Sequence, residues 1–387
     1  MLQGWLDRQA VRLAADVVAD DEGQSVSPAD VVGRARRLWT LAHLRRHGVG
    51  GDAVNHALPI ARALLDRHVD PIHGGYRWFV HPGTGIDHKL LYGQSVVILA
   101  LAELALAEPA MAADAMADAE ATLALVARPL TAGGAVAEFL DTRWQPLPLG
   151  VETVMGRAGT VTVGGQLHLL EAMAVLATAG GGTRSRDVGG RTADILQAWF
   201  LAGPGHPDRS STDERGVPLD VPVSLGHKVE AAWILADAAG ALGLADETPR
   251  ARRWVNQALA VGFRHDGLND DPVRGFRPGG EQRSWWVQAE LLRALVEIDE
   301  GPGSSSRDVL RRLLGWLHRH QVDPRTGQAH QLMTHRGLVL VAGDGTTART
   351  GYHDVRAYVA AAGLLQERPL GGQTRPPPSA DTPPGAQ

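Results

Sequence analysis

Apolar residues recur along most of the chain at the i, i+3, i+4 and i+7 positions that share one face of an α-helix. Alanine and leucine, which favour helices, dominate these segments, and glycine and proline cluster between them. Ser224 is a candidate N-cap. The pattern predicts twelve helices, near 3–20, 28–47, 51–67, 89–107, 110–127, 164–180, 190–201, 226–243, 247–262, 284–299, 306–320 and 352–366.

The links between these helices are unequal in length. Those after the second, fourth, eighth and tenth helices are short, as in Gly48-Val49-Gly50, and a short link makes its two helices antiparallel neighbours. The long links are near 68–88, 128–163, 202–225, 263–283 and 321–351. We therefore expect an all-α fold, an (α/α)6 barrel of six helical hairpins. Its long loops, which carry function more often than short ones, should gather at one end.

Two features of the long links refine this expectation. Val69-Asp70-Pro71-Ile72-His73-Gly74-Gly75 resembles Val322-Asp323-Pro324-Arg325-Thr326-Gly327, and 265–275 is a looser third copy. Repetition explains the similarity better than chance, although Asp-Pro-x-x-Gly is also ordinary turn chemistry. Segment 134–148 alternates around Asp141-Thr142, which predicts a small β-hairpin on the loop face.

Composition narrows the class of protein. The 387 residues include 38 Lys and Arg and 43 Asp and Glu, for a formal charge of −5. There is no basic run of the kind that neutralises phosphates, so nucleic acid is not an expected partner. Cysteine is absent, which excludes disulfides, thiolate zinc sites and cysteine nucleophiles. We expect no membrane span or signal peptide, and a cytoplasmic location by default.

The chain divides unevenly. Residues 1–366 are expected to form one catalytic domain, and 367–387, rich in proline, glycine and serine, a disordered tail. No exposed apolar stripe stands out, so monomer and homodimer are both open.

Unusual polar and aromatic residues fall on the even-numbered helices, mostly in the first two turns. If these helices form the inner wall of the barrel, the side chains converge on a pocket at one mouth. Each alone has an ordinary explanation as a cap, a surface charge or a core residue. His227 and Glu230 could be a helix-face pair, or half of a metal site if a second pair faced them. The residues are Arg36, Trp39, Lys89, Tyr92, Gln94, His168, Glu171, His227, Glu230, Trp285, Trp286, Gln288, Glu290, Tyr352, His353 and Arg356.

These residue types suit chemistry on a sugar. Histidines serve as general acids and bases near neutral pH. Tryptophan rings stack on the apolar faces of sugars, and arginine and glutamate side chains form paired hydrogen bonds with sugar hydroxyls. Two carboxylates flanking a bond would indicate glycoside hydrolysis instead. Because the pocket candidates include three histidines, we favour proton transfer.

Several of these segments resemble the N-acylglucosamine 2-epimerase family, which also contains cellobiose 2-epimerases, mannose 2-epimerases and mannose isomerases. They occur in family order between about residues 34 and 357, and the family fold is an (α/α)6 barrel. The Tyr352-His353 pair fits a sixth segment. The other five are Ala35-Arg36-Arg37-Leu38-Trp39-Thr40, Lys89-Leu90-Leu91-Tyr92-Gly93-Gln94, Leu167-His168-Leu169-Leu170-Glu171-Ala172, Gly226-His227-Lys228-Val229-Glu230 and Trp285-Trp286-Val287-Gln288-Ala289-Glu290.

The resemblance implies a mechanism and a site. The family's two catalytic histidines fall on His227 and His353, one of which would remove the C2 proton of an open-chain aldose to give a cis-enediolate. Arg36 would stabilise the enediolate oxygens. His168 would assist ring opening, and Glu230 would orient His227 and raise its pKa. Tyr92 and Trp286 match pocket-lining positions. The implied chemistry needs no metal, nicotinamide or other cofactor, and the partner is a small sugar.

Two departures from the cellobiose-type members bear on the substrate. Gly164 stands where those members have a sugar-binding Asn, and Ala348 where they have a Trp. A monosaccharide, mannose or glucose, is therefore expected. The resemblance favours a 2-epimerase that interconverts the two. The alternatives are an aldose–ketose isomerase forming fructose by the same enediolate, a glycoside hydrolase on the same barrel, and a non-catalytic sugar-binding protein.

Overall fold

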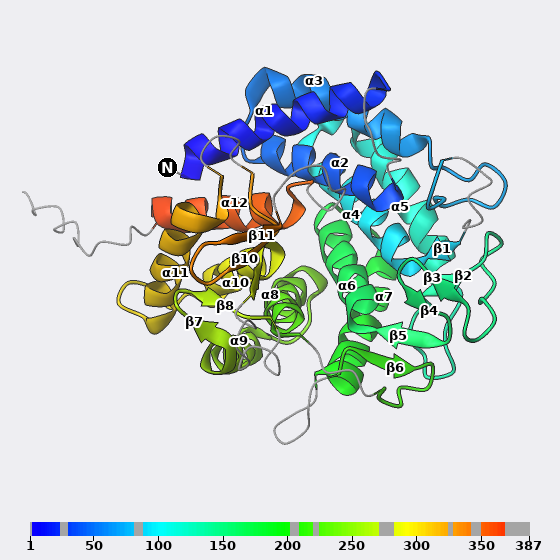
Figure 1. Ribbon diagram of the computed structural model, residues 1–387. Coiled ribbons are helices and arrows are strands. Elements are labelled where there is room, and N and C mark those ends of the chain that lie inside the picture. Colours follow the sequence, from blue (N-terminus) through cyan, green and yellow to red (C-terminus); the bar gives the residue numbers. More distant parts are fainter. Residues whose placement is uncertain are drawn as a thin grey trace, which may run out of the picture.

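The computed structural model describes residues 2–23, 30–80, 88–201, 209–219, 224–270, 282–323, 328–341 and 350–367. Within these ranges the chain forms twelve α-helices (Figure 1). A 3-10 turn precedes α5, and π-helical turns extend α7 and α11. The helices are α1 (Leu2–Asp21), α2 (Val31–Arg46), α3 (Gly51–Asp66), α4 (Leu91–Ala107), α5 (Ala112–Val126), α6 (Val163–Thr178), α7 (Thr183–Ile195), α8 (Leu225–Leu242), α9 (Thr248–Gly262), α10 (Trp285–Glu297), α11 (Ser305–Trp316) and α12 (Tyr352–Glu367).

The helices form two concentric rings. Each even-numbered helix packs against the next even-numbered one, and α12 packs back against α2. The odd-numbered helices lie outside, as α5 on α4 and α9 on α8, and α1 bridges α3 and α12. This arrangement confirms the predicted (α/α)6 barrel.

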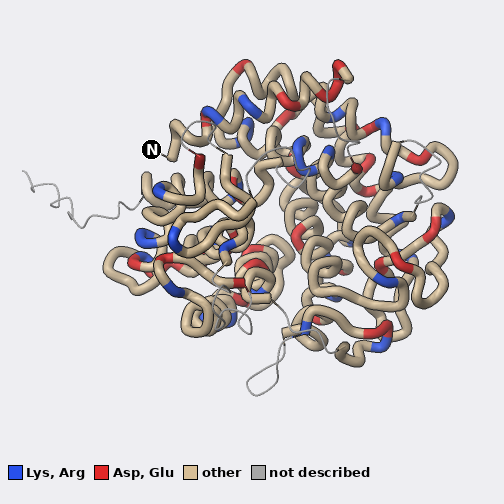
Figure 2. The backbone as a smooth tube through the Cα atoms, viewed as in Figure 1, with Lys and Arg blue, Asp and Glu red and all other residues tan. Residues whose placement is uncertain are grey.

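Burial explains which helices are inside. The inner helix α4 is buried on every side from Ser95 to Leu104, as a helix surrounded by protein must be. The outer helix α9 buries one stripe, with Ala251, Val255 and Ala258 facing α8 and solvent on the other side. Charges of both signs are interspersed over the molecule (Figure 2). None of the helices in the described part of the chain has the length and apolar character that a membrane span requires.

Short antiparallel strands join the long loops. The predicted hairpin within 134–148 exists in reduced form: the Asp141 N–H donates to the Gln145 carbonyl, and Leu140 and Pro146 form a single bridge. The strands are β1 (Lys89–Leu90) with β2 (Phe139–Leu140), β3 (Glu152–Thr153) with β4 (Gly156–Arg157), β5 (Thr160–Thr162) with β6 (Ser211–Asp213), β7 (Phe263–Arg264) with β8 (Gly267–Leu268), and β9 (Gln282–Ser284) with β10 (Leu332–Thr334) and β11 (Val339–Val341).

The two clearest copies of the sequence repeat make equivalent backbone contacts at their ends, and residues 324–327 of the second copy lie outside the described residues. Val69 bridges Tyr76 in the first, and Val322 bridges Ala329 in the second. The N–H of the repeat aspartate donates to a carbonyl five residues on in both, at 2.9 Å from Asp70 and 2.8 Å from Asp323. The third copy contains the β7–β8 hairpin, while its 271–275 part lies outside the described residues, as do Ala348 and the tail 368–387.

Buried glutamines tie these loops to the inner helices. Gln94 on α4 donates to the Tyr76 carbonyl at 2.7 Å and accepts from its N–H at 3.0 Å. Gln288 on α10 makes the same pair of bonds with Leu268, at 2.7 and 2.9 Å. Gln94 and Gln288 were pocket candidates, but they act as clamps that hold the loops over the inner ring.

Candidate active site

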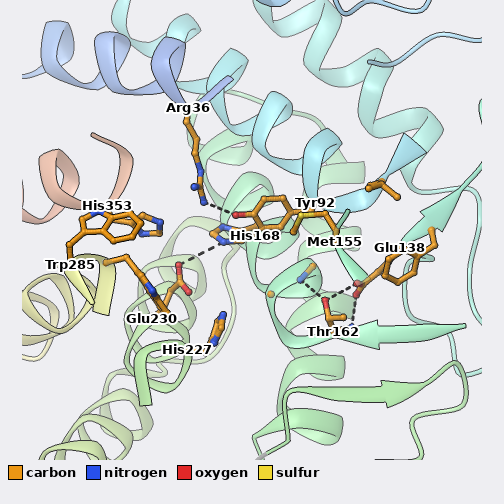
Figure 3. Close-up of a pocket in the computed structure, with 15 residues that line it drawn as sticks. Arg36, Tyr92, Glu138, Met155, Thr162, His168, His227, Glu230, Trp285 and His353 are labelled. Carbon is orange, nitrogen blue, oxygen red and sulfur yellow. Dashed lines mark hydrogen bonds and ion pairs between the residues drawn. The ribbon is translucent and has the colours of Figure 1, made fainter. Parts of the chain in front are cut away.

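A cavity of ≈ 290 Å³ opens where the N-terminal ends of the even-numbered helices meet the loop strands (Figure 3). All seven residues predicted from the sequence as catalytic or substrate-binding line it: Arg36, Tyr92, His168, His227, Glu230, Trp286 and His353. The remaining lining residues are Leu90, Glu138, Phe139, Met155, Thr162, Gly164, Gly165 and Trp285.

His353 enters from the first turn of α12 and is anchored from behind. Its Nδ1 lies 2.5 Å from Glu290 Oε1, and Arg356 donates to the same oxygen at 2.7 Å. Burial opposes ionisation of Glu290, but Arg356 and the His353 bond outweigh it and hold the pKa of Glu290 below its usual range. Burial lowers the pKa of His353 to about 4. His353 is therefore a neutral imidazole that donates from Nδ1 and keeps Nε2 as a base.

His168 on α6 is held in the same way by a different carboxylate. Its Nδ1 lies 3.0 Å from Glu171 Oε2, and Glu171 also accepts hydrogen bonds from Tyr352 and Arg356. Burial lowers the pKa of His168 despite this carboxylate. A neutral ring with Nδ1–H toward Glu171 leaves Nε2 on the cavity side.

His227 has a different anchor from the one expected. Its Nδ1 lies 2.8 Å from the hydroxyl of Ser224, which also accepts the His227 backbone N–H as the N-cap of α8. Burial lowers the pKa of His227, and Asp270 only partly opposes this. The expectation that Glu230 orients His227 and raises its pKa is therefore wrong.

Glu230 points toward His168 instead. Its Oε1 lies 3.8 Å from His168 Nε2, and the residue is 2% exposed. Burial, together with the neighbouring charge of Glu290, raises the pKa of Glu230 well above its usual value. The two carboxyls therefore differ: Glu290 is held in its ionised form, whereas the environment of Glu230 favours the protonated form, which could donate a hydrogen bond.

Arg36 brings positive charge to the cavity wall. Its Nη2 donates to the Tyr92 hydroxyl at 2.6 Å, and its guanidinium lies 4.6 Å from the centre of the Tyr352 ring. No carboxylate pairs with it among the ion pairs of the described residues. A buried cation in this position can stabilise negative charge that develops on a bound ligand.

Trp285 and Trp286 open α10, and both line the cavity. The Trp286 ring centre lies 5.1 Å from that of His227 and 6.1 Å from that of His353. The indole is therefore a platform between the two histidines, where the apolar face of a sugar can pack.

The cavity wall opposite His227 and His353 was not predicted from the sequence. Glu138, Phe139 and Met155 come from the loops between α5 and α6, and the alternating segment around Glu138 indicated only a hairpin. Burial raises the pKa of Glu138 to about 7. Nothing in a single sequence distinguishes this carboxylate from a solvent-facing one in a hairpin.

One group of described residues has donor atoms close enough together for a metal ion: Glu230, Glu290 and His353. Two of these side chains are already engaged, since His353 and Arg356 both bond Glu290 Oε1, and burial favours the protonated form of Glu230 over the carboxylate that a metal would need. The Arg356 guanidinium supplies the positive charge that a cation would otherwise bring.

Comparison with known proteins identifies related chains. The model of the N-acylglucosamine 2-epimerase (GlcNAc 2-epimerase) family matches residues 17–177 and 220–357. A cellobiose 2-epimerase of Dictyoglomus turgidum is 24% identical over 278 residues, 69% of each chain.

Solved structures are similar over most of the chain. The cellobiose 2-epimerase from Spirochaeta thermophila has a TM-score of 0.74 at 25% identity, covering 88% of this chain and 87% of that one. A D-mannose isomerase has a TM-score of 0.72 at 18% identity, covering 88% and 90%. A family 76 α-mannanase of Bacteroides thetaiotaomicron shares the fold at a TM-score of 0.60 and 11% identity, covering 95% and 96%.

Proposed function

The chain belongs to the N-acylglucosamine 2-epimerase family and is an isomerase-class enzyme, and we propose that it interconverts D-mannose and D-glucose without a cofactor. One observation carries the proposal: His227 and His353 reach one cavity from different helices, each anchored through Nδ1 and each neutral. Two independent bases are what removal and return of a proton on opposite faces of one carbon require.

The reaction starts from the open-chain sugar. His168 lies between Tyr92 and Glu230, where it can exchange a proton with the ring oxygen or the C1 hydroxyl. One of His227 and His353 then takes the C2 proton on its free Nε2. The electron pair of the C–H bond forms the C1–C2 double bond, and the carbonyl becomes an enediolate oxygen.

The enediolate needs positive and hydrogen-bonding partners, because a proton next to a carbonyl is only weakly acidic. Arg36 supplies the charge, and Glu230, whose raised pKa favours the protonated form, can supply a hydrogen bond. The second histidine first takes a proton from solvent on Nε2 and then gives it to C2 on the other face, while the C1 carbonyl re-forms and the first histidine releases its proton to solvent. The product is the 2-epimer, and the protein regains its original protonation by exchange with solvent.

A monosaccharide fits the cavity better than a disaccharide. The volume of ≈ 290 Å³ lies at the lower limit of small-molecule sites, which span about 300–1,000 Å³. Trp285 and Trp286 provide apolar faces beside the histidines. Among the described residues that line the cavity there is no third tryptophan on which a second sugar ring could stack.

Aldose–ketose isomerisation is the second candidate, because it shares the enediolate. Delivery of the proton to C1 instead of C2 would yield fructose. The structural similarity to a D-mannose isomerase is the observation that favours fructose formation as the second candidate reaction.

The product identifies the activity. The protein is incubated with D-mannose, and the sugars are followed by NMR. Glucose as the first product supports the epimerase proposal, and fructose indicates the isomerase. An unchanged mannose sample, together with release of reducing ends from a mannose oligosaccharide, would contradict both and indicate a hydrolase.

A further inference from the structure

The cavity has two chemically different sides (Figure 3). His227, Glu230, Trp285 and His353 lie on one side, and Glu138, Thr162 and Met155 on the other. If C1 and C2 of the substrate lie at the histidines, the remaining carbons extend toward the second side. The proposed mechanism uses no residue there.

Glu138 is fixed in place on this second side. It is 6% exposed. Its carboxylate accepts hydrogen bonds from the Thr162 N–H at 2.8 Å, the Thr162 hydroxyl at 2.7 Å and the Gln166 amide at 3.0 Å. These donors lie at the start of α6, so the carboxylate is held directly against that helix.

The adjacent glycine makes this position possible. A Cβ added at Gly165 would lie 2.5 Å from both the carboxyl carbon and Oε2 of Glu138, closer than atoms can approach. Only a residue without a side chain lets the carboxylate rest against the α6 backbone. The wall is therefore built around Glu138.

The scaffold does not use all of the carboxylate's hydrogen-bonding capacity. An ionised carboxylate offers about four acceptor sites, and three are taken by Thr162 and Gln166. No cation is among the groups that act on Glu138. Its pKa of about 7 reflects an ion buried without a countercharge. Hydroxyl donors of a bound sugar would satisfy the remaining site.

The same wall has room for those hydroxyls. Gly164 lines the cavity, and a Cβ added there would meet nothing within 4 Å. Its backbone is not in the left-handed region, so conformation alone does not require glycine. The absent side chain leaves space in the cavity, one residue before the glycine that packs against Glu138.

We propose that Glu138 is a specificity-determining residue that accepts a hydrogen bond from the terminal hydroxyl, on C6, of a hexose, at the wall where Gly164 leaves space open. The proposal rests on the proposed function, because the position of C1 and C2 at the histidines orients the sugar. It explains why a buried carboxylate lines the wall opposite His227 and His353.

The test compares Glu138→Gln with wild type on two sugars, D-mannose and D-lyxose, a pentose with the same C2 to C4 configuration but no C6. The variant keeps the side-chain shape but loses the charged acceptor. Loss of a hydrogen bond to a charged group costs about tenfold or more in binding. We expect KM for mannose to rise about tenfold, KM for lyxose less than threefold, and kcat for both to stay within about twofold.

Glu152→Gln is the matched control, because Glu152 is exposed in the same loop region. We expect this variant to have the wild-type KM and kcat for both sugars. Equal losses on both sugars would indicate a purely structural role and overturn the proposal, as would no loss on mannose. If Glu138→Gln does not fold, Gly164→Val leaves the bonds of Glu138 intact and narrows the same space. It should raise KM for mannose more than for lyxose, and equal effects would again overturn the proposal.

Failure of the proposed function gives a different result. If wild type converts neither sugar, that function is wrong, and calorimetric binding of D-mannose then decides the role of Glu138. Tenfold weaker binding to Glu138→Gln would support the role, and equal binding would exclude it.

Discussion

At the scale of single residues, three histidines in the cavity are each held at the same ring nitrogen, but by different residues. His168, His227 and His353 are each engaged at Nδ1, by Glu171, Ser224 and Glu290 respectively. Anchoring one nitrogen fixes the ring and leaves the other for the substrate. Burial lowers the pKa of each ring, so each is a neutral base at pH 7.

The lowered histidine pKa values predict an unusual pH profile. A base must be deprotonated to accept the C2 proton, so kcat/KM falls only when pH drops through the pKa of the free enzyme. For His353 that pKa is about 4, and for His227 it is below 6.5. The acid limb of kcat/KM, measured from pH 4 to 8, should have its midpoint below 6.5. A midpoint at or above 6.5 would show that burial does not control these rings.

Glu290 should matter for catalysis although it does not line the cavity. Glu290→Gln removes the charge that accepts from His353, Arg356 and the Trp233 indole. We expect kcat to fall about 100-fold, because His353 loses its orientation and tautomer, as well as a lower melting temperature. Glu297→Gln, farther along α10 and paired with Arg293, is the control and should retain near-normal kcat. Normal kcat in Glu290→Gln would contradict the anchoring role.

The sequence allowed the cavity-lining residues on helices to be predicted, but not those on loops. His227, Glu230 and His353 begin inner helices, and helical periodicity is enough to bring such positions together. Glu138 was missed because its place depends on a loop of 36 predicted residues, 128–163, whose path no local pattern determines. The predicted partner of Glu230 was wrong for a similar reason. Glu230 on α8 lies next to His168 on α6, whereas the predicted partner, His227, lies on the same helix as Glu230.

At the scale of elements, caps and clamps determine where the inner helices begin and how the loops attach. Asp30, Thr162 and Ser224 cap α2, α6 and α8 by accepting N–H groups of the first turn. The predicted cap at Ser224 is confirmed. Gln94 and Gln288 then hold two loops against the first turns of α4 and α10, so each of these loops has a fixed position next to the inner ring.

Loss of a clamp should loosen one loop and destabilise the fold. Gln288→Ala leaves the N–H and carbonyl of Leu268 without partners in a buried site. The expected cost is about 2–4 kcal/mol, measured as the free energy of unfolding in urea. Gln3→Ala, on the exposed face of α1, should change it by less than about 0.5 kcal/mol. Equal stabilities of the two variants would contradict the clamp.

Most helix boundaries follow from the sequence, and the exceptions have physical causes. The seventh helix was expected near 190, but α7 begins at Thr183. Its first turns contain serine and glycine, which have low helix propensity, and few apolar residues, yet Ser185, Val188 and Gly189 are buried in the structure. Tertiary packing therefore extends a helix that local propensity does not predict.

At the scale of the whole molecule, the chain ends close the ring. Trp5 of α1 stacks on Tyr358 of α12 with ring centres 4.3 Å apart, and α12 packs against α2. The predicted twelve helices and alternating loop lengths were enough to infer this ring. The polar residues lie near the N-termini of the even-numbered helices, and this position predicted the end of the barrel at which the site is found.

Ring closure should contribute to stability but not to chemistry. Trp5→Ala removes a large buried side chain from the contact between α1 and α12, and truncations of this kind cost about 3–5 kcal/mol. We expect a melting temperature lower by several degrees, with KM unchanged at temperatures where the variant is folded. Val11→Ala, on the exposed face of α1, is the control. A Trp5→Ala protein as stable as that control would contradict the closure.

Deuterium incorporation tests whether two histidines move a proton at C2 of the sugar. Wild type, His227→Asn, His353→Asn and the exposed control His56→Asn are incubated with D-mannose in deuterated water and followed by NMR. We expect deuterium at C2 of the glucose formed by wild type and His56→Asn. We expect rates at least about 10³-fold lower for the other two variants, which should remain folded. Glucose without deuterium at C2, or near-full exchange in either pocket-histidine variant, would show that the two histidines do not transfer this proton.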